Sequence, residues 1–216
     1  MFIGHFAVGF AAKGVSPKPS LATYLAAAQL PDLLWPVLLL AGVEHVTIAP
    51  GDTTFTPLRF DSYPVSHSLV TVAAWGAVFA GLVWWRNRDR RGALTCWALV
   101  VSHWLLDFIS HRPDMPLSPG SSTKLGLGLW NSVPLTLGVE AMIFGLGVWL
   151  YVRGTRPRDA IGRWGLVGLV ALALAAYLGA AFGPPAPSVP AIAVTAILGA
   201  LVFLGVSAWV DRHRVV

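Results

Sequence analysis

Residues 86–111 have the sequence RNRDRRGALTCWALVVSHWLLDFISH, which joins a cluster of arginines to a long apolar run. A loop with four arginines is followed by a 20-residue segment, 92–111, that is apolar apart from a few side chains. An α-helix needs about 20 mostly apolar residues to cross the hydrocarbon core of a bilayer. The segment therefore predicts a transmembrane helix, and the arginines predict a loop at one membrane surface.

The composition of the whole chain also favours a membrane protein. Of 216 residues, 56% are hydrophobic and 12% are charged, whereas about a quarter of the residues of a soluble domain are charged. Ten tryptophans and 22 glycines agree with this class, because Trp gathers at membrane interfaces and transmembrane helices tolerate Gly. The single cysteine, Cys96, excludes an intramolecular disulfide and a cysteine-cluster metal site.

Five segments are long and apolar enough to span a bilayer. They are 64–85, 92–111, 127–152, 163–183 and 190–210. A sixth segment, 20–43, is interrupted by Gln29, Pro31 and Asp32, and the apolar stretch 2–12 is too short to span. We predict an all-α, polytopic transmembrane bundle of about six spanning helices, with a short N-terminal helix that is re-entrant or half-buried.

The basic residues are distributed unevenly between the predicted loops. If the segments alternate across the membrane, 12 of the 15 Lys and Arg residues fall on one side, and Arg59, Arg112 and Lys124 are the exceptions. The positive-inside rule then predicts that the basic loops and the C-terminus are cytoplasmic. The N-terminus is expected there too, unless the first short stretch enters from outside. The net charge of +5 therefore reflects membrane topology, and we expect no nucleic-acid partner.

Three ionisable side chains share one face of segment 92–111. His103, Asp107 and His111 are spaced four residues apart, so a helix places them within about 80° of one another. Ionisable groups inside membrane segments are costly and often functional. Because imidazole nitrogen and carboxylate oxygen suit zinc, this face predicts a divalent metal site. The alternative is an imidazole–carboxylate hydrogen bond that joins helices.

His67 lies just after Pro64, near the start of segment 64–85. Proline suits the first turn of a helix, so we expect His67 at the outer end of this span. The Arg-rich loop joins the segment to the next one as an antiparallel hairpin, which brings His67 near His111. We therefore predict His67 as a further metal ligand, the alternative being a residue of the membrane interface.

Two carboxylates lie at membrane depth on other segments. Asp32 follows Pro31, which we expect to break the helix, and irregular backbone there requires surrounding protein or a water-filled cavity. Asp32 is predicted as a metal ligand or general base, or alternatively as a polar plug at the break. Glu140 lies at the depth of His103 by helical rise and is a candidate general base or a group behind the ligands.

Four short motifs occur in order along the first half to two-thirds of the chain. They are Gly4-His5, Pro31-Asp32, Ser66-His67-Ser68-Leu69, and Ser102-His103 with Asp107. Together they resemble a bacterial inner-membrane family described as membrane-bound metal-dependent hydrolases. The His-x-x-x-Asp spacing is also similar to the metal-binding helix of zinc-dependent phospholipase C and related single-strand nucleases. The resemblance implies that the histidines and aspartates of these motifs, His5 included, are metal ligands in the bacterial inner membrane.

The chain differs from the family pattern in three places. Leu33 follows the Pro-Asp motif where further acids are usual, and Ser62, beside Asp61, stands where many members have an extra histidine. His111 lies in the segment that replaces the usual Thr-Pro-x-Gly. Asp61 and His111 are therefore the candidates for the missing site residues, Asp61 as a catalytic carboxylate and His111 as a ligand.

These patterns predict a hydrolase that uses one or more divalent ions, zinc first, at the outer face of the cytoplasmic membrane. Zinc would lower the pKa of water to about 7, and Asp61 or Glu140 would accept a proton. Arg112 or Lys124 would pair with the phosphate of a phosphate-ester or phospholipid-like substrate, with membrane lipid as the expected partner. We expect residues 1–216 to form a single membrane domain. Residues 1–125 carry the motifs, and the helices of 126–216 are expected mostly to support them.

Two non-enzymatic functions are the alternatives. Paired histidines could ligate haem in an electron carrier, although Asp107 favours a harder metal. Buried acids could relay protons or cations in a transporter, although the sequence has no inverted repeat of broken helices.

Overall fold

The computed structural model describes all 216 residues and confirms an all-α membrane fold. Its five long apolar helices are α5 (Leu69–Asn87), α6 (Arg90–Ser110), α7 (Val133–Gly154), α8 (Ala160–Phe182) and α9 (Val189–Arg212). They correspond to the five predicted segments. Helix α5 begins later than predicted because the Ser68 side chain accepts a hydrogen bond from the Thr71 amide and caps the helix there.

The sixth span is broken into α2 (Leu21–Ala28) and α3 (Leu30–Leu40), which are bent by 59° relative to each other. The break lies at Gln29 and not at Pro31, where the sequence placed it. Pro31 instead occupies the first turn of α3, where its missing N–H costs no intrahelical bond. The carbonyl of Ala28, at the end of α2, is left without a backbone hydrogen-bond partner.

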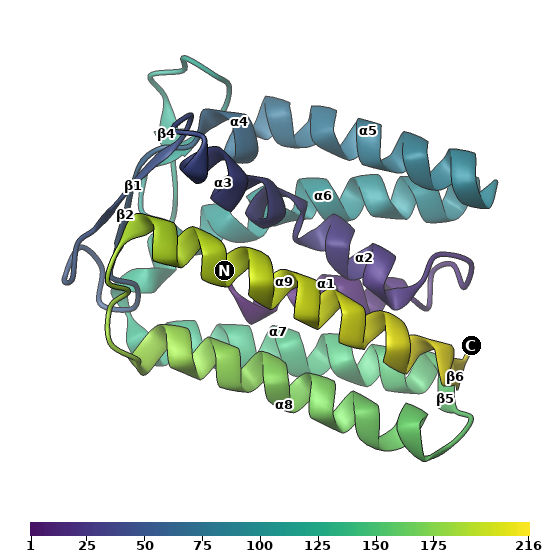
Figure 1. Ribbon diagram of the computed structural model, residues 1–216. Coiled ribbons are helices and arrows are strands. Elements are labelled where there is room, and N and C mark those ends of the chain that lie inside the picture. Colours follow the sequence, from purple (N-terminus) through teal and green to yellow (C-terminus); the bar gives the residue numbers. More distant parts are fainter.

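The short helix α1 (Ile3–Ala12) lies inside the bundle. The sequence predicted a short N-terminal helix that is re-entrant or half-buried. Seven of its ten residues are buried. Its first turn is near the middle of the molecule, and it leads toward the end where the chain terminates (Figure 1). The N-terminal end of α1 is therefore enclosed by protein and does not lie at either end of the bundle.

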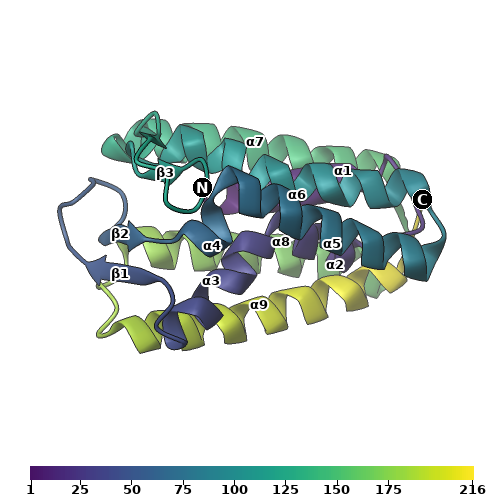
Figure 2. The same cartoon turned by 90° about the horizontal axis from the view of Figure 1, so that it is seen from above.

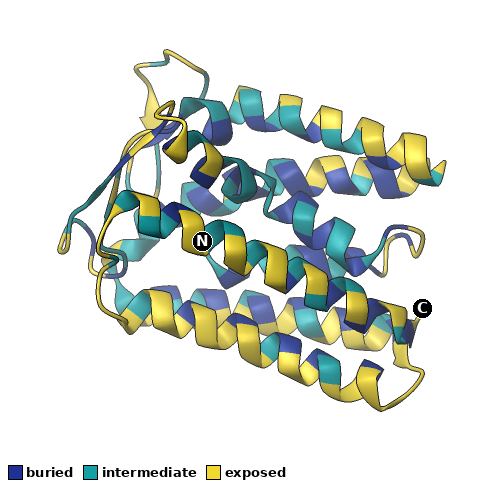
Figure 3. Cartoon of the chain, in the orientation of Figure 1, coloured by how far each residue is buried: buried dark blue, intermediate teal, exposed yellow.

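The helices form two outer layers around an interior that contains two hydrophobic clusters and the buried polar motifs. Helices α5 and α6 lie side by side, α7 and α8 lie on the opposite side, and α1 and α2 run between them (Figures 1 and 2). Helix α9 packs against α2, α3 and α8. Buried residues face inward and exposed residues face outward along every long helix (Figure 3).

The outward faces are apolar, as a lipid-facing surface requires. Helix α9 has the highest mean hydropathy of the five spans, yet only 11% of its most apolar 18-residue stretch is buried inside the protein. A soluble protein would not leave so large an apolar surface in water. The packing thus supports the membrane assignment independently of the composition.

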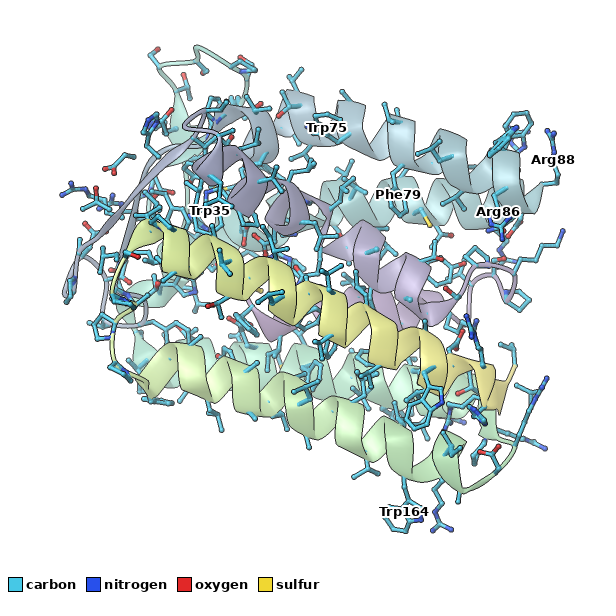
Figure 4. The ribbon with its side chains drawn as sticks, viewed as in Figure 1. Trp35, Trp75, Phe79, Arg86, Arg88 and Trp164 are labelled. Atoms are coloured by element: carbon cyan, nitrogen blue, oxygen red, sulfur yellow. The ribbon has the colours of Figure 1, made fainter.

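One end of the bundle, which we call the basic end, gathers most of the cationic loops. The Lys13 ammonium pairs with Asp211 at 2.8 Å, and β5 (Arg156–Pro157) pairs with β6 (Arg214–Val215). Arg86, Arg88 and Trp164 extend from this end (Figure 4). Exposed tryptophans ring the same end, and three of them stack under arginines; the pairs are Trp84–Arg88, Trp149–Arg153 and Trp164–Arg163. Such a belt is typical of a membrane–water interface.

The opposite end, which we call the hairpin end, carries short elements between the long helices. They are β1 (His45–Ile48), β2 (Leu58–Ser62), α4 (Pro64–His67), β3 (Met115–Pro116), β4 (Lys124–Leu125) and the single 3-10 turn η1 (Leu129–Asn131). Two of them, α4 and η1, occupy the starts of the predicted spans 64–85 and 127–152, so α5 and α7 begin later than predicted. Strand β1 pairs with β2, and β3 pairs with β4, both antiparallel. The sequence did not predict these short ladders. They cover the end of the bundle where the polar motifs meet.

Candidate metal centre

Asp107 lies on the buried face of α6, with four imidazole rings around its carboxylate. His5 Nε2 lies 3.0 Å from Asp107 Oδ1, and His103 Nε2 lies 3.1 Å from Oδ2. His67 Nε2 and His111 Nε2 lie 3.8 and 4.0 Å from the same carboxylate. The four histidines come from α1, α4, α6 and the residue that caps α6. The structure thus brings together the histidines and the aspartate that the motifs singled out.

Three of these imidazoles use the other ring nitrogen, Nδ1, to contact the protein. His103 Nδ1 donates to the Ala28 carbonyl at 2.8 Å, and this is the carbonyl that has no backbone partner at the end of α2. His111 Nδ1 donates to Asp114 Oδ1 at 3.0 Å, and His67 Nδ1 lies 2.6 Å from Ser66 Oγ. A neutral imidazole that donates through Nδ1 has a lone pair on Nε2. The Nε2 lone pairs of these histidines therefore face the Asp107 carboxylate, whose oxygens also carry lone pairs.

Asp32 completes the cluster from the first turn of α3. Its Oδ1 lies 3.4 Å from His67 Nε2 and 3.7 Å from His103 Nε2. The Asp32 side chain is 41% exposed, whereas those of His103 and Asp107 are almost fully buried. The cluster is therefore closed on most sides and open at Asp32.

The geometry fits a metal ion. Two groups of three residues, His5-His103-Asp107 and Asp32-His67-His103, each offer ligand atoms within 4.8 Å of one another. With ligand bonds of about 2.0–2.2 Å, a tetrahedral ion separates its ligands by roughly 3.3–3.6 Å, which is close to the distances in the cluster. His103 Nε2 is buried and has no hydrogen-bond partner. The buried His and Asp side chains could thus hold a metal ion.

The position of His5 depends on how α1 docks against α7. Glu140 Oε2 accepts hydrogen bonds from the amides of Phe2 and Gly4, at 2.8 and 3.1 Å. These amides belong to the first turn of α1, which has no other acceptor of its own. Glu140 therefore lies behind the ligands and anchors the helix that carries His5. It belongs to neither group that could hold an ion.

A positive charge also lies beside Asp107. The α-amino group of Met1 contacts Asp107 Oδ1 and donates to Ser110 Oγ at 2.8 Å. This amine places a positive charge beside the buried carboxylate, as an ionised group at this depth requires.

His111 joins the cluster to a second polar group at the hairpin end. The Tyr63 hydroxyl donates to Asp114 Oδ1 at 2.7 Å and lies 3.3 Å from His111 Nδ1. Burial, together with the Asp114 carboxylate, raises the pKa of Tyr63 well above its usual value. Tyr63 therefore remains a neutral hydrogen-bond donor between Asp114 and the ring of His111.

Asp61, predicted as a catalytic carboxylate, makes its polar contacts within a hairpin and not with Asp107. Asp61 accepts from Thr47 at 2.6 Å and from Arg59 at 2.9 Å on the β1–β2 hairpin. The hydrogen bond from Thr47, with the help of Arg59, holds the pKa of Asp61 below its usual range. Nothing in these contacts links Asp61 to the cluster around Asp107.

Arg112 and Lys124 differ in how free their charges are. The Arg112 guanidinium pairs with Asp52 at 2.6 Å and with Asp114 at 3.2 Å, so its charge is shared by two carboxylates. Lys124 is exposed and lines a cleft of about 210 Å³, together with Tyr63, Asp114 and several serines. Of the two predicted phosphate-binding residues, only Lys124 lines this cleft.

The sequence did not identify Glu44 as a site residue. Glu44 is 1% exposed and accepts a hydrogen bond from the segment that carries His67. Tyr63 and Ser66 were also not identified as contributors. No local spacing connects these residues to a ligand, because their contacts are made between separate loops. The one signal in the sequence was the position of Glu44, an acid directly after the apolar segment 20–43.

Comparisons with models of known protein families, with curated proteins and with solved structures gave no match for this chain.

Proposed function

We propose that this chain is a metal-dependent hydrolase embedded in the bacterial cytoplasmic membrane, acting on a phosphate ester at the outer face. The observation that carries the proposal is the arrangement around Asp107. Imidazole lone pairs of His103 and His111 point at a carboxylate inside the bundle. Acceptors that face each other at low dielectric favour a cation between them, in addition to the Met1 α-amino group that contacts Asp107 Oδ1.

Zinc is the ion that the ligand set suits best, because imidazole nitrogens with a carboxylate are typical zinc ligands. His103 would hold it together with either His5 and Asp107 or His67 and Asp32, and His111 lies behind Asp107. When bound, such an ion supplies Lewis-acid polarisation of a phosphoryl oxygen and lowers the pKa of water.

The residues of the chain supply proton transfer and substrate binding. Asp32 is the carboxylate at the open edge of the cluster, so its Oδ atoms are placed to accept a proton from an entering water molecule. Asp61 and Glu140 hold other hydrogen bonds and are weaker candidates for this role. Lys124 in the polar cleft beside Tyr63 would pair with the phosphate group.

The orientation follows from the charges of the two ends. By the positive-inside rule the basic end faces the cytoplasm, so the hairpin end and the metal cluster face outward. The substrate would then be a phosphate ester of the outer leaflet or of the space beyond it.

One observation disfavours the haem alternative. The rings of His5 and His103 are stacked, with centroids 3.7 Å apart and planes 8° from parallel. A porphyrin between two axial histidines needs space that this stack does not leave. A proton- or cation-handling role stays the alternative function, and it predicts no hydrolysis.

The first experiment is a metal count on protein purified in mild detergent without chelators. Wild type would be compared with a His103→Ala, Asp107→Asn double variant. The matched control is His213→Ala with Asp159→Asn, which alters an exposed His–Asp pair, 2.7 Å apart, at the basic end. We expect about one or more divalent ions per chain in wild type and control, and none in the first variant.

Phosphate-ester hydrolysis would then be assayed with bis(p-nitrophenyl) phosphate and short-chain phospholipids. Hydrolysis that is lost with chelator and restored with zinc supports the proposal. Wild-type protein that stays empty after incubation with zinc or manganese rejects the metal site. Metal-loaded protein that hydrolyses neither substrate class rejects phosphoesterase activity and leaves only metal binding.

A further inference from the structure

Glu44 is a fully enclosed carboxylate in the loop between α3 and β1. It is 1% exposed. Its Oε1 accepts hydrogen bonds from the amides of Val65 and Ser66, both at 2.8 Å, and its Oε2 lies 2.6 Å from Ser66 Oγ. Every polar contact of this carboxylate therefore goes to α4, the single turn that carries His67.

The directions of these hydrogen bonds are fixed by the number of available protons. A carboxylate only accepts, so the one hydroxyl proton of Ser66 is donated to Glu44. Ser66 Oγ also lies 2.6 Å from His67 Nδ1. Since the hydroxyl has no second proton, it must accept at this contact, and His67 must donate through Nδ1.

The consequence is a defined tautomer of His67. With the proton on Nδ1, the lone pair is on Nε2, the atom that lies 3.4 Å from Asp32 and 3.8 Å from Asp107. The other tautomer would present an N–H to the cluster and could not ligate a cation.

We propose that Glu44 and Ser66 are positioning residues that hold His67 in its metal-ligating tautomer. The role of the metal rests on the proposed function, whereas the tautomer can be measured without any metal. Groups behind a ligand commonly change metal affinity by about 10–100-fold when removed.

The sharpest variant is Glu44→Gln, because it keeps shape and reverses one hydrogen bond. The glutamine oxygen still accepts from Val65 and Ser66, but its NH₂ group now faces Ser66 Oγ. The hydroxyl then accepts from glutamine and is free to donate to His67 Nδ1. We expect His67 to change to the Nε2–H tautomer, and the affinity for zinc to fall about 10–100-fold.

The readout is the ¹⁵N NMR spectrum of histidine-labelled, metal-free protein in detergent, with His67 assigned from a His67→Gln variant. Zinc affinity of the same samples is measured by competition with a chelating dye. Ser66→Ala provides a second test, since it removes the acceptor of the Nδ1 proton. Its matched control is Ser68→Ala, because the Ser68 hydroxyl contacts Thr71 in the cap of α5 and not an imidazole.

The proposal is supported if wild type and Ser68→Ala show Nδ1–H, and Glu44→Gln shows Nε2–H with weakened zinc binding. It is overturned if His67 keeps Nδ1–H in both Glu44→Gln and Ser66→Ala, or if wild type itself carries Nε2–H. A wild-type protein with the Nδ1–H tautomer that binds no zinc would reject the proposed function while leaving the tautomer assignment in place.

Discussion

At the residue scale, the centre contains side chains that face Asp107 and side chains behind them that fix how they are oriented. His103 and Asp107 share a face of α6 because helical residues four apart are neighbours, and this needs no tertiary information. Glu44 and Tyr63 reach the cluster through loop contacts that have no period in the sequence. The sequence therefore identified the atoms that face the centre and missed those that orient them.

Glu140 provides a prediction at this scale. It was expected to be a general base or a group behind the ligands, and its contacts favour the second role because Oε2 accepts two amides of α1. Glu140→Ala leaves these buried N–H groups without acceptors, at a cost of about 1–3 kcal/mol each. We expect a lower melting temperature and weaker zinc binding. Glu140→Gln keeps an accepting oxygen and should retain metal affinity.

The measurement is thermal unfolding in detergent together with zinc titration of both variants. If Glu140→Gln binds metal normally but loses hydrolysis, Glu140 takes part in proton transfer and the capping role is insufficient.

At the scale of elements, the lengths and order of the spans were predictable, but the site of the break was not. Apolar length alone predicted α5 to α9. The bend between α2 and α3 falls at Gln29, before the proline, because proline is compatible with the first turn of the following helix. This shift matters for the site, since it leaves the Ala28 carbonyl free to orient His103.

The close packing of α1 on α7 leads to a second prediction. A Cβ atom added at Gly147 would overlap the backbone of Ala7, whereas one added at Gly145 would meet nothing within 4 Å. Gly147→Ala should therefore push α1 away from α7, at a cost of about 1–3 kcal/mol, and weaken zinc binding through His5.

Gly145→Ala on the same helix is the control. It should leave metal affinity unchanged, because it adds the same methyl group at an open position. Equal melting temperatures and equal zinc affinities for the two variants would show that the α1–α7 contact does not position His5.

At the scale of the whole molecule, the charge asymmetry predicts the orientation. The only native cysteine, Cys96, is buried and is expected to be unreactive toward maleimides in the folded protein. Single cysteines at two exposed positions, Ser122→Cys near the hairpin end and Ala160→Cys near the basic end, can therefore report on each side.

We expect a membrane-impermeant maleimide to label Ser122→Cys in intact spheroplasts and Ala160→Cys only after permeabilisation. Wild type should stay unlabelled in both conditions. The reverse pattern would place the metal cluster at the cytoplasmic face and would contradict the proposed outer-face substrate.

The half-length helix α1 also has a consequence for biosynthesis. A ribosome delivers α1 before its partners Asp107 and Gly147, which lie about half and two-thirds of the way along the 216 residues. His5 can therefore reach its place only late in membrane insertion, once α6 and α7 are present. Truncated or stalled chains would lack a complete ligand set, so metal capture would mark the end of assembly.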